Sequence, residues 1–239
     1  MDALDVEIRE LRTIEDLRQC VALQFATWDQ SDATPANQLI ISIKTGGHVL
    51  AAYHEGRLVS FAYAFPAVLP GQEPWIASHL LATDKEYRGR GLGQLLKWKQ
   101  REWALARGFR RITWTFDPLE AKNCHLNMNL LGAQCQEYIV NCYGELDDQL
   151  NRGLPTDRLT ADWDLQAPHV AALAAGRKEA PWEPKARVAI HPDFQALKRQ
   201  DLQEAIAIRM RVREELQRHL GAGLKVYGLD REASELLLR

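Results

Sequence analysis

The stretch DKEYRGRGLGQLLK, from Asp84 to Lys97, places three glycines at alternate positions among arginines and leads directly into an apolar helical pattern. The strand-like run WIASHLLAT, which ends at Thr83, comes just before it. A helix N-terminus presents unpaired N–H groups and a partial positive charge, and glycines let a ligand approach the backbone. The stretch therefore predicts an anion site, most naturally for phosphates, with Arg88 and Arg90 adding charge. The spacing alone also fits a glycine-rich turn before a solvated, charged helix face, to which the basic run that begins at Lys97 would belong.

Composition bounds the class of protein. The chain has 239 residues, of which 46% are hydrophobic, and this is enough for a substantial core. With 30 basic and 32 acidic residues the net charge is -2, so we expect no nucleic-acid partner and only a local polyanion site. The acidic N-terminus lacks the apolar region of a signal peptide, and no apolar run approaches the ~20 residues of a membrane span. These features predict a soluble, cytoplasmic protein without a membrane partner.

The cysteines do not suggest a metal site or a disulfide framework. Their spacing is not that of metal ligands, and a chain of this size does not need disulfides to fold. We therefore expect reduced, buried or incidental thiols and no bound metal. The four residues are Cys20, Cys124, Cys135 and Cys142.

The apolar patterns predict an α/β fold in which helices and strands are interleaved. The first half should contain a strand over 6–12, helices over 13–28 and 37–44, a hairpin turning at Glu55-Gly56, a strand over 75–83 and a helix from Leu92 that Gly108 ends. Next should follow a strand over 110–116, a short helix over 123–131 and strands over 134–143 and 158–165.

The composition changes after Gln166, where three prolines and a short alanine-rich helix indicate a linker or surface layer. A strand over 186–192, an amphipathic helix over 201–220 and a terminal strand pair are predicted to follow. We therefore divide the chain into a main domain, 1–166, and a C-terminal α+β extension, 167–239. The single apolar stripe of the amphipathic helix fits docking on its own domain as well as on a partner.

Two kinds of phosphate-binding loop compete for the glycine stretch. The dinucleotide fingerprint requires a third glycine where Gln94 stands, although Asp117 ends the next strand at about the right distance for a ribose contact. A Walker A loop is excluded because no Gly-Lys-Ser/Thr is present. The pattern R-x-x-G-x-G is met by Arg88, Gly91 and Gly93, and it is similar to the acetyl-CoA-binding loop of the GNAT superfamily of N-acyltransferases.

The resemblance extends over residues 6–165, because the order of predicted elements is also that of a GNAT domain. The segment 114–159 further resembles a bacterial branch of predicted GNAT acetyltransferases that carries a C-terminal extension. The resemblance implies a GNAT acyl-CoA N-acyltransferase fold, with a mixed, centrally splayed sheet flanked by helices. It also implies acyl transfer, with acetyl-CoA as co-substrate and no metal, to a small amine such as an amino acid or a related metabolite. The extension could complete the acceptor pocket or form a homodimer contact.

In this family, backbone N–H groups of the glycine loop hold the pyrophosphate of coenzyme A. The end of the preceding strand pairs with the pantetheine arm like an added strand, and one N–H polarises the thioester carbonyl. Asn123 matches the asparagine of the later family motif. The resemblance therefore implies coenzyme A contacts at Leu81, Ala82, Thr83, Arg88, Gly89, Arg90, Gly91, Leu92, Gly93 and Asn123.

The catalytic acid and base depart from the family pattern. Leu130 stands where the usual tyrosine acid is expected, and Tyr143 could replace it from the next strand, or could be a packed strand tyrosine. His79 lies in the strand from which family members often project a base, and a histidine is suited to accept a proton. A buried structural histidine is the alternative. Glu137 and Glu145 are weaker candidates for the base.

Other features leave alternatives open. Cys124-His125 invites a nucleophile or metal interpretation, but no third partner is evident. Arg158 either forms an ion pair with Asp157 or contacts an acceptor carboxylate. Since the family's acid is displaced, the chain could be a non-catalytic acyl-CoA-binding protein. A dinucleotide-dependent oxidoreductase is the third hypothesis.

Overall fold

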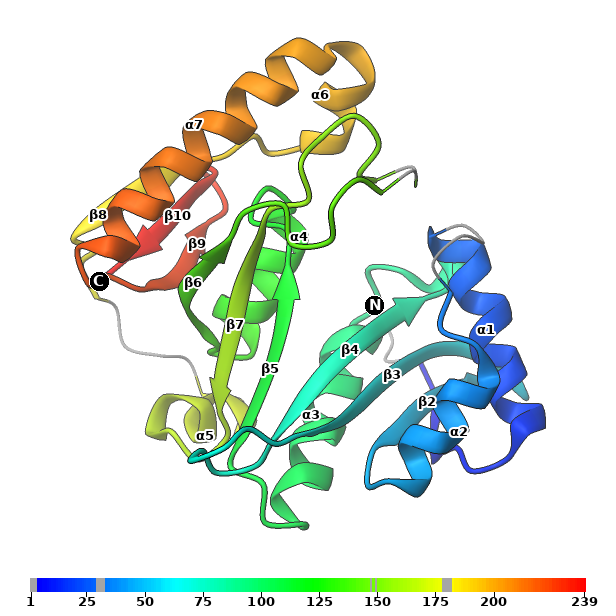
Figure 1. Ribbon diagram of the computed structural model, residues 1–239. Coiled ribbons are helices and arrows are strands. Elements are labelled where there is room, and N and C mark those ends of the chain that lie inside the picture. Colours follow the sequence, from blue (N-terminus) through cyan, green and yellow to red (C-terminus); the bar gives the residue numbers. More distant parts are fainter. Residues whose placement is uncertain (1–3, 29–32, 147, 149, 178–181) are drawn as a thin grey trace. The chain divides into compact units, whose positions relative to one another are not determined.

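The structure is a computed structural model that describes residues 4–28, 33–146, 148, 150–177 and 182–239 (Figure 1). The chain forms two compact units, Met1–Thr113 and Trp114–Arg239, and it passes from one to the other within strand β5 (Arg111–Phe116). The predicted α/β class with a mixed sheet is confirmed. The domain boundary predicted near Gln166 separates a main domain from an extension. It does not coincide with the boundary between these two compact units, and it stays a prediction.

The first unit is built on four strands and the start of β5, in the order β1-β2-β3-β4-β5. The first three pairings are antiparallel, and β4 pairs with β5 in parallel. Its elements are β1 (Glu7–Glu10), α1 (Ile14–Trp28), α2 (Ala36–Lys44), β2 (His48–His54), β3 (Arg57–Ala67), β4 (Trp75–Thr83), η1 (Lys85–Tyr87) and α3 (Leu92–Leu105).

Local signals in the sequence explain the boundaries of these elements. Thr13 caps α1, because the Asp16 N–H donates to Thr13 Oγ1 over 3.2 Å. Glu55 and Gly56 both have positive φ, 49° and 77°, which is the backbone that a two-residue hairpin between β2 and β3 requires. Gly108, with φ 83°, ends the turn after α3. These predicted signals are confirmed.

The strands β2 and β3 are buried on both faces. One apolar cluster joins Phe61 to Leu17 of α1 and Leu39 of α2. A second cluster joins Ala62 to Leu96 of α3. Because successive side chains of a strand point to opposite faces, α1 and α2 cover one face of the sheet and α3 covers the other. Ala82 of β4 belongs to the first cluster and Leu81 packs against the second, so the end of β4 is held between the same two layers.

The second unit continues β5 into a sheet with the order β5-β7-β6-β9-β10-β8. The helix α6 of this unit was not predicted from the sequence. Its elements are α4 (Ala121–Cys124), the π-helical turn η2 (His125–Leu130), β6 (Gln134–Ile139), β7 (Arg158–Asp164), α5 (Pro168–Ala174), β8 (Ala186–Ala189), α6 (Phe194–Gln200), α7 (Leu202–Gly221), β9 (Val226–Asp230) and β10 (Glu235–Leu238).

The extension is joined to the rest of the second unit through backbone pairing and through α7. Strand β6 pairs with β9 at Cys135 and Val226. The Asn129 amide bonds to both backbone groups of Leu229, at 2.9 Å each, and so acts as one more strand partner. Of the predicted face of α7, four members are buried: Ala205, Arg209, Val212 and Leu216.

The predicted strand over 134–143 is too long. Strand β6 ends at Ile139 because Asn141 takes the left-handed conformation, with φ 49°, and turns the chain. Tyr143 therefore lies in a turn and not in a strand.

Two further observations concern the predicted class of protein. No helix in the described part of the chain combines the length and apolar character needed to cross a membrane. The four cysteines are free thiols, and Cys20, Cys124 and Cys135 are buried.

Candidate functional site

The glycine stretch forms a turn between β4 and α3. Asp84 Oδ1 accepts from the Glu86 N–H over 3.0 Å and starts η1. The chain then passes through Gly89 and Gly91, with φ 78° and 81°. A Cβ added to either glycine would meet nothing within 4 Å, so the left-handed backbone, and not a lack of space, favours glycine here. Gly91 is also the N-cap of α3, and it offers no side chain to cap the helix.

The backbone amides of this turn are available to a ligand. No hydrogen bond to another described residue is formed by the N–H groups from Gly89 to Gly93, and the ladder of α3 starts with Leu95 N donating to Gly91 O at 3.0 Å. Arg88 and Arg90 are exposed beside them. Convergent N–H donors at a helix N-terminus with two guanidinium groups form a site that fits a pyrophosphate.

The end of β4 presents a free backbone edge. Asp84 N donates to Val59 O over 2.9 Å on the β3 side. Since hydrogen-bonding directions alternate along an antiparallel strand, Ala82 also faces β3, whereas Leu81 and Thr83 face the opposite edge. On that edge β4 pairs with β5 only at positions 76 and 77. The backbone groups of Leu81 and Thr83, but not those of Ala82, therefore lie on an edge of β4 to which an extended ligand can add as a further strand.

Arg88 fastens the glycine turn to this edge. Its Nε donates to Thr83 O over 3.1 Å. Arg90 instead stands over the Tyr87 ring, with its guanidinium carbon 5.5 Å from the ring centroid. Both guanidinium groups are thus held near the turn.

His79 occupies a bulge in β4. The register passes from Tyr63–Leu80 to Ala64–Ser78, which leaves His79 without a partner in β3. The side chain is exposed, so the interpretation as a buried structural histidine is wrong. The rings of Tyr63 and Phe65 lie 6.0 and 6.1 Å away, and this partly desolvated setting lowers the pKa of His79. A neutral imidazole at pH 7 can accept a proton.

A buried polar chain lies behind β4. Lys97 Nζ donates to Ser78 Oγ at 2.9 Å and to Gln100 Oε1 at 3.0 Å. The Gln100 amide nitrogen lies 3.1 Å from His48 Nε2. Lys97 is 2% exposed, and burial lowers its pKa well below the usual value. Lys97 therefore does not belong to the solvated basic helix face on which the sequence placed it, nor does it add an exposed charge to the turn.

The second unit holds the other candidates. Tyr143 is 46% exposed, so it is not a packed strand tyrosine, and its hydroxyl lies 2.5 Å from Thr115 Oγ1. Asn123 is exposed in α4, and Leu130, which ends η2, has no hydroxyl to offer. Glu137 accepts from Thr160 Oγ1 over 2.7 Å at the surface. The glycine turn, the β4 edge and His79 belong to the first unit.

Asp117 is not free to bind a ribose. Its two oxygens accept from Arg209 Nη1 at 2.8 Å and Nη2 at 2.5 Å, and the Leu119 N–H donates to Oδ1 at 2.8 Å. The position of Asp117 therefore no longer favours a dinucleotide site. Cys124 is buried and donates to Pro118 O at 3.3 Å. Within the described ranges, no cluster of three His, Cys, Asp or Glu residues is arranged to hold a metal ion.

The predicted ion pair between Asp157 and Arg158 is wrong. The Asp157 carboxylate pairs with Arg213, at 2.7 and 2.8 Å, because α7 brings that residue against it. Arg158 donates to Asp157 O at 2.9 Å and to Asn151 Oδ1 at 2.8 Å. Its guanidinium lies 5.3 Å from the centroid of the Tyr143 ring. Its ion-pair contact with Asp117 is long, 3.8 Å, and its side chain is 10% exposed.

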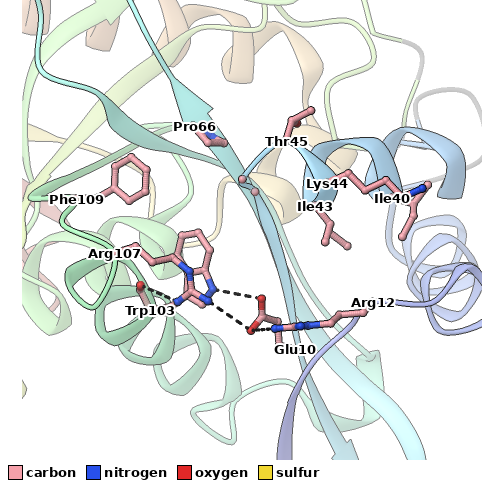
Figure 2. Close-up of a pocket in the computed structure, with 12 residues that line it drawn as sticks. Glu10, Arg12, Ile40, Ile43, Lys44, Thr45, Pro66, Trp103, Arg107 and Phe109 are labelled. Carbon is pink, nitrogen blue, oxygen red and sulfur yellow. Dashed lines mark hydrogen bonds and ion pairs between the residues drawn. The ribbon is translucent and has the colours of Figure 1, made fainter.

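A separate pocket of about 670 Å³ lies in the first unit (Figure 2). Pro66, which lines it, pairs with Ile76 near the start of β4, whereas the glycine turn follows Thr83. Seven residues of strand, about 23 Å, separate these two ends. Figure 2 shows the Glu10 carboxylate directed at Arg12 and at the Trp103 indole, each 3.4 Å away. This pocket is therefore not part of the candidate site.

Comparisons with known proteins concern the family and the fold of the chain. Residues 12–129 match the model of the acetyltransferase (GNAT) family. No match was found among curated proteins. Among solved structures, the ribosomal-protein-S18-alanine N-acetyltransferase from Escherichia coli has 17% identity and a TM-score of 0.55, covering 67% of this chain and 94% of its own.

Two further structures have the same fold. Arabidopsis thaliana Naa50, in complex with the bisubstrate analogue CoA-Ac-MVNAL, has 15% identity and a TM-score of 0.54, over 66% of this chain and 97% of its own. An acetyltransferase of the GNAT family from Streptococcus pneumoniae has 18% identity and a TM-score of 0.51, over 66% and 98%. At these identities the likeness shows the fold alone.

Proposed function

Because the chain belongs to the acetyltransferase (GNAT) family and is an N-acyltransferase, we propose that it transfers an acetyl group from coenzyme A to a small amine, such as an amino acid or a related metabolite. The observation that carries the donor half of this proposal is the run of unpaired amides from Gly89 to Gly93 at the N-terminus of α3. The residues fit coenzyme A, since a pyrophosphate requires such donors and Arg88 and Arg90 supply charge.

When bound, acetyl-CoA supplies an acyl group that is activated as a thioester. The backbone groups of Leu81 and the N–H of Thr83 pair with the extended pantetheine arm at the free edge of β4, where Thr83 O accepts from Arg88 Nε. An N–H group of this edge donates to the thioester carbonyl oxygen, where negative charge develops during attack. Water is displaced from the edge by the same pairing, which strengthens the hydrogen bond.

His79 and Tyr143 are proposed to handle the protons. His79 is exposed on β4 with a lowered pKa, so it is neutral at pH 7 and can accept a proton from the acceptor amine. The Tyr143 hydroxyl, exposed beside Thr115, donates a proton to the departing sulfur. Tyr143 thereby takes the acid role of the family tyrosine, because Leu130 stands at the usual position of that tyrosine.

Arg158 supports an acceptor that carries a carboxylate. Its guanidinium lies against Tyr143, and its ion-pair contact with Asp117 is 3.8 Å long. Asp117 in turn is held in a two-point contact by Arg209. A carboxylate on the acceptor would provide Arg158 with a closer anionic partner, as an amino acid does.

The test is release of free thiol from acetyl-CoA in the presence of matched acceptors. Amino acids are compared with their carboxamides and with the corresponding decarboxylated amines. We expect turnover with the amino acids and at least about tenfold lower kcat/KM without the carboxylate, a loss of about 1.4 kcal/mol. Thermal-shift titration with coenzyme A and with NAD runs beside it. No shift with coenzyme A would refute the donor, and equal turnover of all three acceptors would refute the carboxylate.

A further inference from the structure

We propose that Arg213, in the C-terminal extension, is a positioning residue for Tyr143, because it holds the Asp157 carboxylate on which the turn carrying Tyr143 is built. The inference rests on the proposed function, in which Tyr143 is the acid. It gives the extension a role in the reaction, through three successive layers of contact that all lie in the second unit.

The turn 140–144 has little regular structure of its own. Asn141 is left-handed, with φ 49°, and Gly144 N donates back to Asn141 O at 3.1 Å. The remaining backbone donors go to the segment just before β7. Cys142 N donates to Thr156 O, and Tyr143 N donates to Thr156 Oγ1, each at 2.9 Å. The position of Tyr143 therefore depends on where residues 156 and 157 are held.

Asp157 is the centre of this arrangement. Its side chain is 0% exposed. Oδ1 accepts from the Asn141 N–H at 3.0 Å, and Oδ2 accepts from the Tyr138 hydroxyl at 2.7 Å. Burial raises the pKa of this carboxyl, but the hydrogen bonds from Arg213, Tyr138 and Asn141 outweigh it and hold the pKa below its usual value. Asp157 is thus a buried carboxylate that fixes Asn141, the second residue of the turn.

Arg213 supplies the compensating charge in a fixed geometry. Nε donates to Asp157 Oδ2 at 2.7 Å and Nη2 to Oδ1 at 2.8 Å. Such a two-point contact fixes the plane of the carboxylate as well as its position. Arg209, one turn earlier on α7, uses the same kind of contact on Asp117. Arg213 therefore aligns Oδ1 with the Asn141 N–H, and the turn transmits this alignment to Tyr143.

The structural half of the proposal is tested by hydrogen exchange, which does not depend on activity. Exchange of the peptide spanning 140–144 is compared in wild type, Arg213→Ala and Arg211→Ala. Arg211 lies on the same helix but pairs with Glu215 at 3.1 Å and bonds to Ala189 O. We expect about tenfold faster exchange or more in Arg213→Ala only. Unchanged exchange in Arg213→Ala would overturn the inference.

The functional half is tested by a double-mutant cycle on kcat. We expect Arg213→Ala to lower kcat about tenfold in the wild-type background. It should have no further effect in Tyr143→Phe, because the two substitutions remove the same contribution, that of the Tyr143 hydroxyl. The KM for acetyl-CoA should stay unchanged. An equal loss in both backgrounds would mean a general structural role and overturn the inference, as would a Tyr143→Phe enzyme as active as wild type.

The outcomes separate this inference from the proposed function. A wild-type enzyme that transfers no acyl group refutes the proposed function, while the exchange data still decide whether Arg213 fixes the turn. If Arg213→Ala does not fold, Arg213→Lys keeps the charge but loses the two-point contact. We expect Arg213→Lys to fold, with faster exchange over 140–144 and reduced kcat. Wild-type exchange and kcat in Arg213→Lys would overturn the inference.

Discussion

At the scale of single residues, three observations support His79 as a general base: it lies in a bulge of β4, its side chain is exposed, and its pKa is lowered from 6.5. A base must be neutral, so activity should be complete at pH 7 and fall as the pH drops below 6.5 through the lowered pKa.

His79→Gln should therefore remove the acidic limb of the kcat/KM profile and lower kcat about a hundredfold. The measurement is kcat/KM between about pH 4.5 and 8. His219→Gln, at the end of α7, is the matched control and should behave as wild type. An acidic limb that persists unchanged in His79→Gln would exclude His79 as the base.

A second histidine is predicted to act on stability. His48 is fully buried, and burial together with the charges of Lys97 and Arg107 lowers its pKa to about 3. Below pH 6.5 the unfolded chain binds a proton that the folded chain does not, so stability falls as the pH drops from 6.5 to about 3. The effect is on the order of several kcal/mol at most, since each pKa unit is worth about 1.4 kcal/mol.

His48→Phe keeps an aromatic ring against Trp103, whose ring centroid lies 4.0 Å away at a tilt of 39°, and removes the titrating group. We expect the free energy of unfolding of His48→Phe to depend less on pH over this range. Urea unfolding of both proteins at about pH 7, 6 and 5, values on both sides of the reference pKa, measures this dependence. Parallel curves for the two proteins would contradict the assignment.

Lys97 shows what could and could not be predicted at this scale. The sequence assigned it to a basic, solvated helix face, because lysines are rarely buried. Its position on α3, three residues before Gln100 and one after Leu96, was the available signal, since both of those residues are buried. What the sequence did not contain was the polar partner, Ser78, which lies on another element.

At the scale of elements, the glycine turn and α3 are the proposed donor site. Gly91 has φ 81° and nothing within 4 Å of an added Cβ, so Gly91→Ala strains the backbone without a clash. We expect a loss of about 1–2 kcal/mol in stability and at least about tenfold weaker binding of coenzyme A, because the amides turn away.

Gly176→Ala is the matched control. Gly176 also has positive φ, 71°, and open space, but it follows α5. Isothermal titration with coenzyme A and thermal unfolding of both variants test the prediction. If Gly176→Ala weakens coenzyme A binding as much as Gly91→Ala, the turn is not the binding element.

The elements near the site were largely predictable from local signals. The strand over 75–83, the Glu55-Gly56 hairpin and the start of α3 at Leu92 are as the sequence predicts, because alternation, turn residues and helical period act locally. The end of β6 was not predictable. Residues 156 and 157, more than a dozen positions away, hold the turn at Asn141. The helix α6 was missed, although Asp193 accepts from the Ala196 N–H as an N-cap at 2.9 Å.

At the scale of the whole molecule, the extension contributes charge to the interior of the second unit. Arg209, 1% exposed, is paired with Asp117, and Arg213 with Asp157. A chain of residues 1–166 would leave both carboxylates without these partners, and removing one partner of a buried pair costs about 3–5 kcal/mol. We expect the shortened chain not to fold cooperatively, whereas the full chain does. A cooperative melt of 1–166 at the wild-type temperature would contradict this.

The predicted separation into 1–166 and 167–239 followed a change in composition, and composition does not reveal these long-range pairs. Arg209 stands at helical steps from Ala205 and Val212, so the period of the sequence places it on the inward face of α7, but its partner, Asp117, is 92 residues away. The identity of that partner depends on the tertiary fold, which brings the end of β5 and α7 together within the second unit.

The central claim is that the amides from Gly89 to Gly93 bind the pyrophosphate of coenzyme A. A crystal structure of the full chain grown with coenzyme A tests it most directly. The account predicts phosphate oxygens within about 3.2 Å of these nitrogens and the pantetheine arm beside Leu81 and Thr83. Coenzyme A bound elsewhere, with the turn empty or its amides bonded to protein atoms, would contradict it.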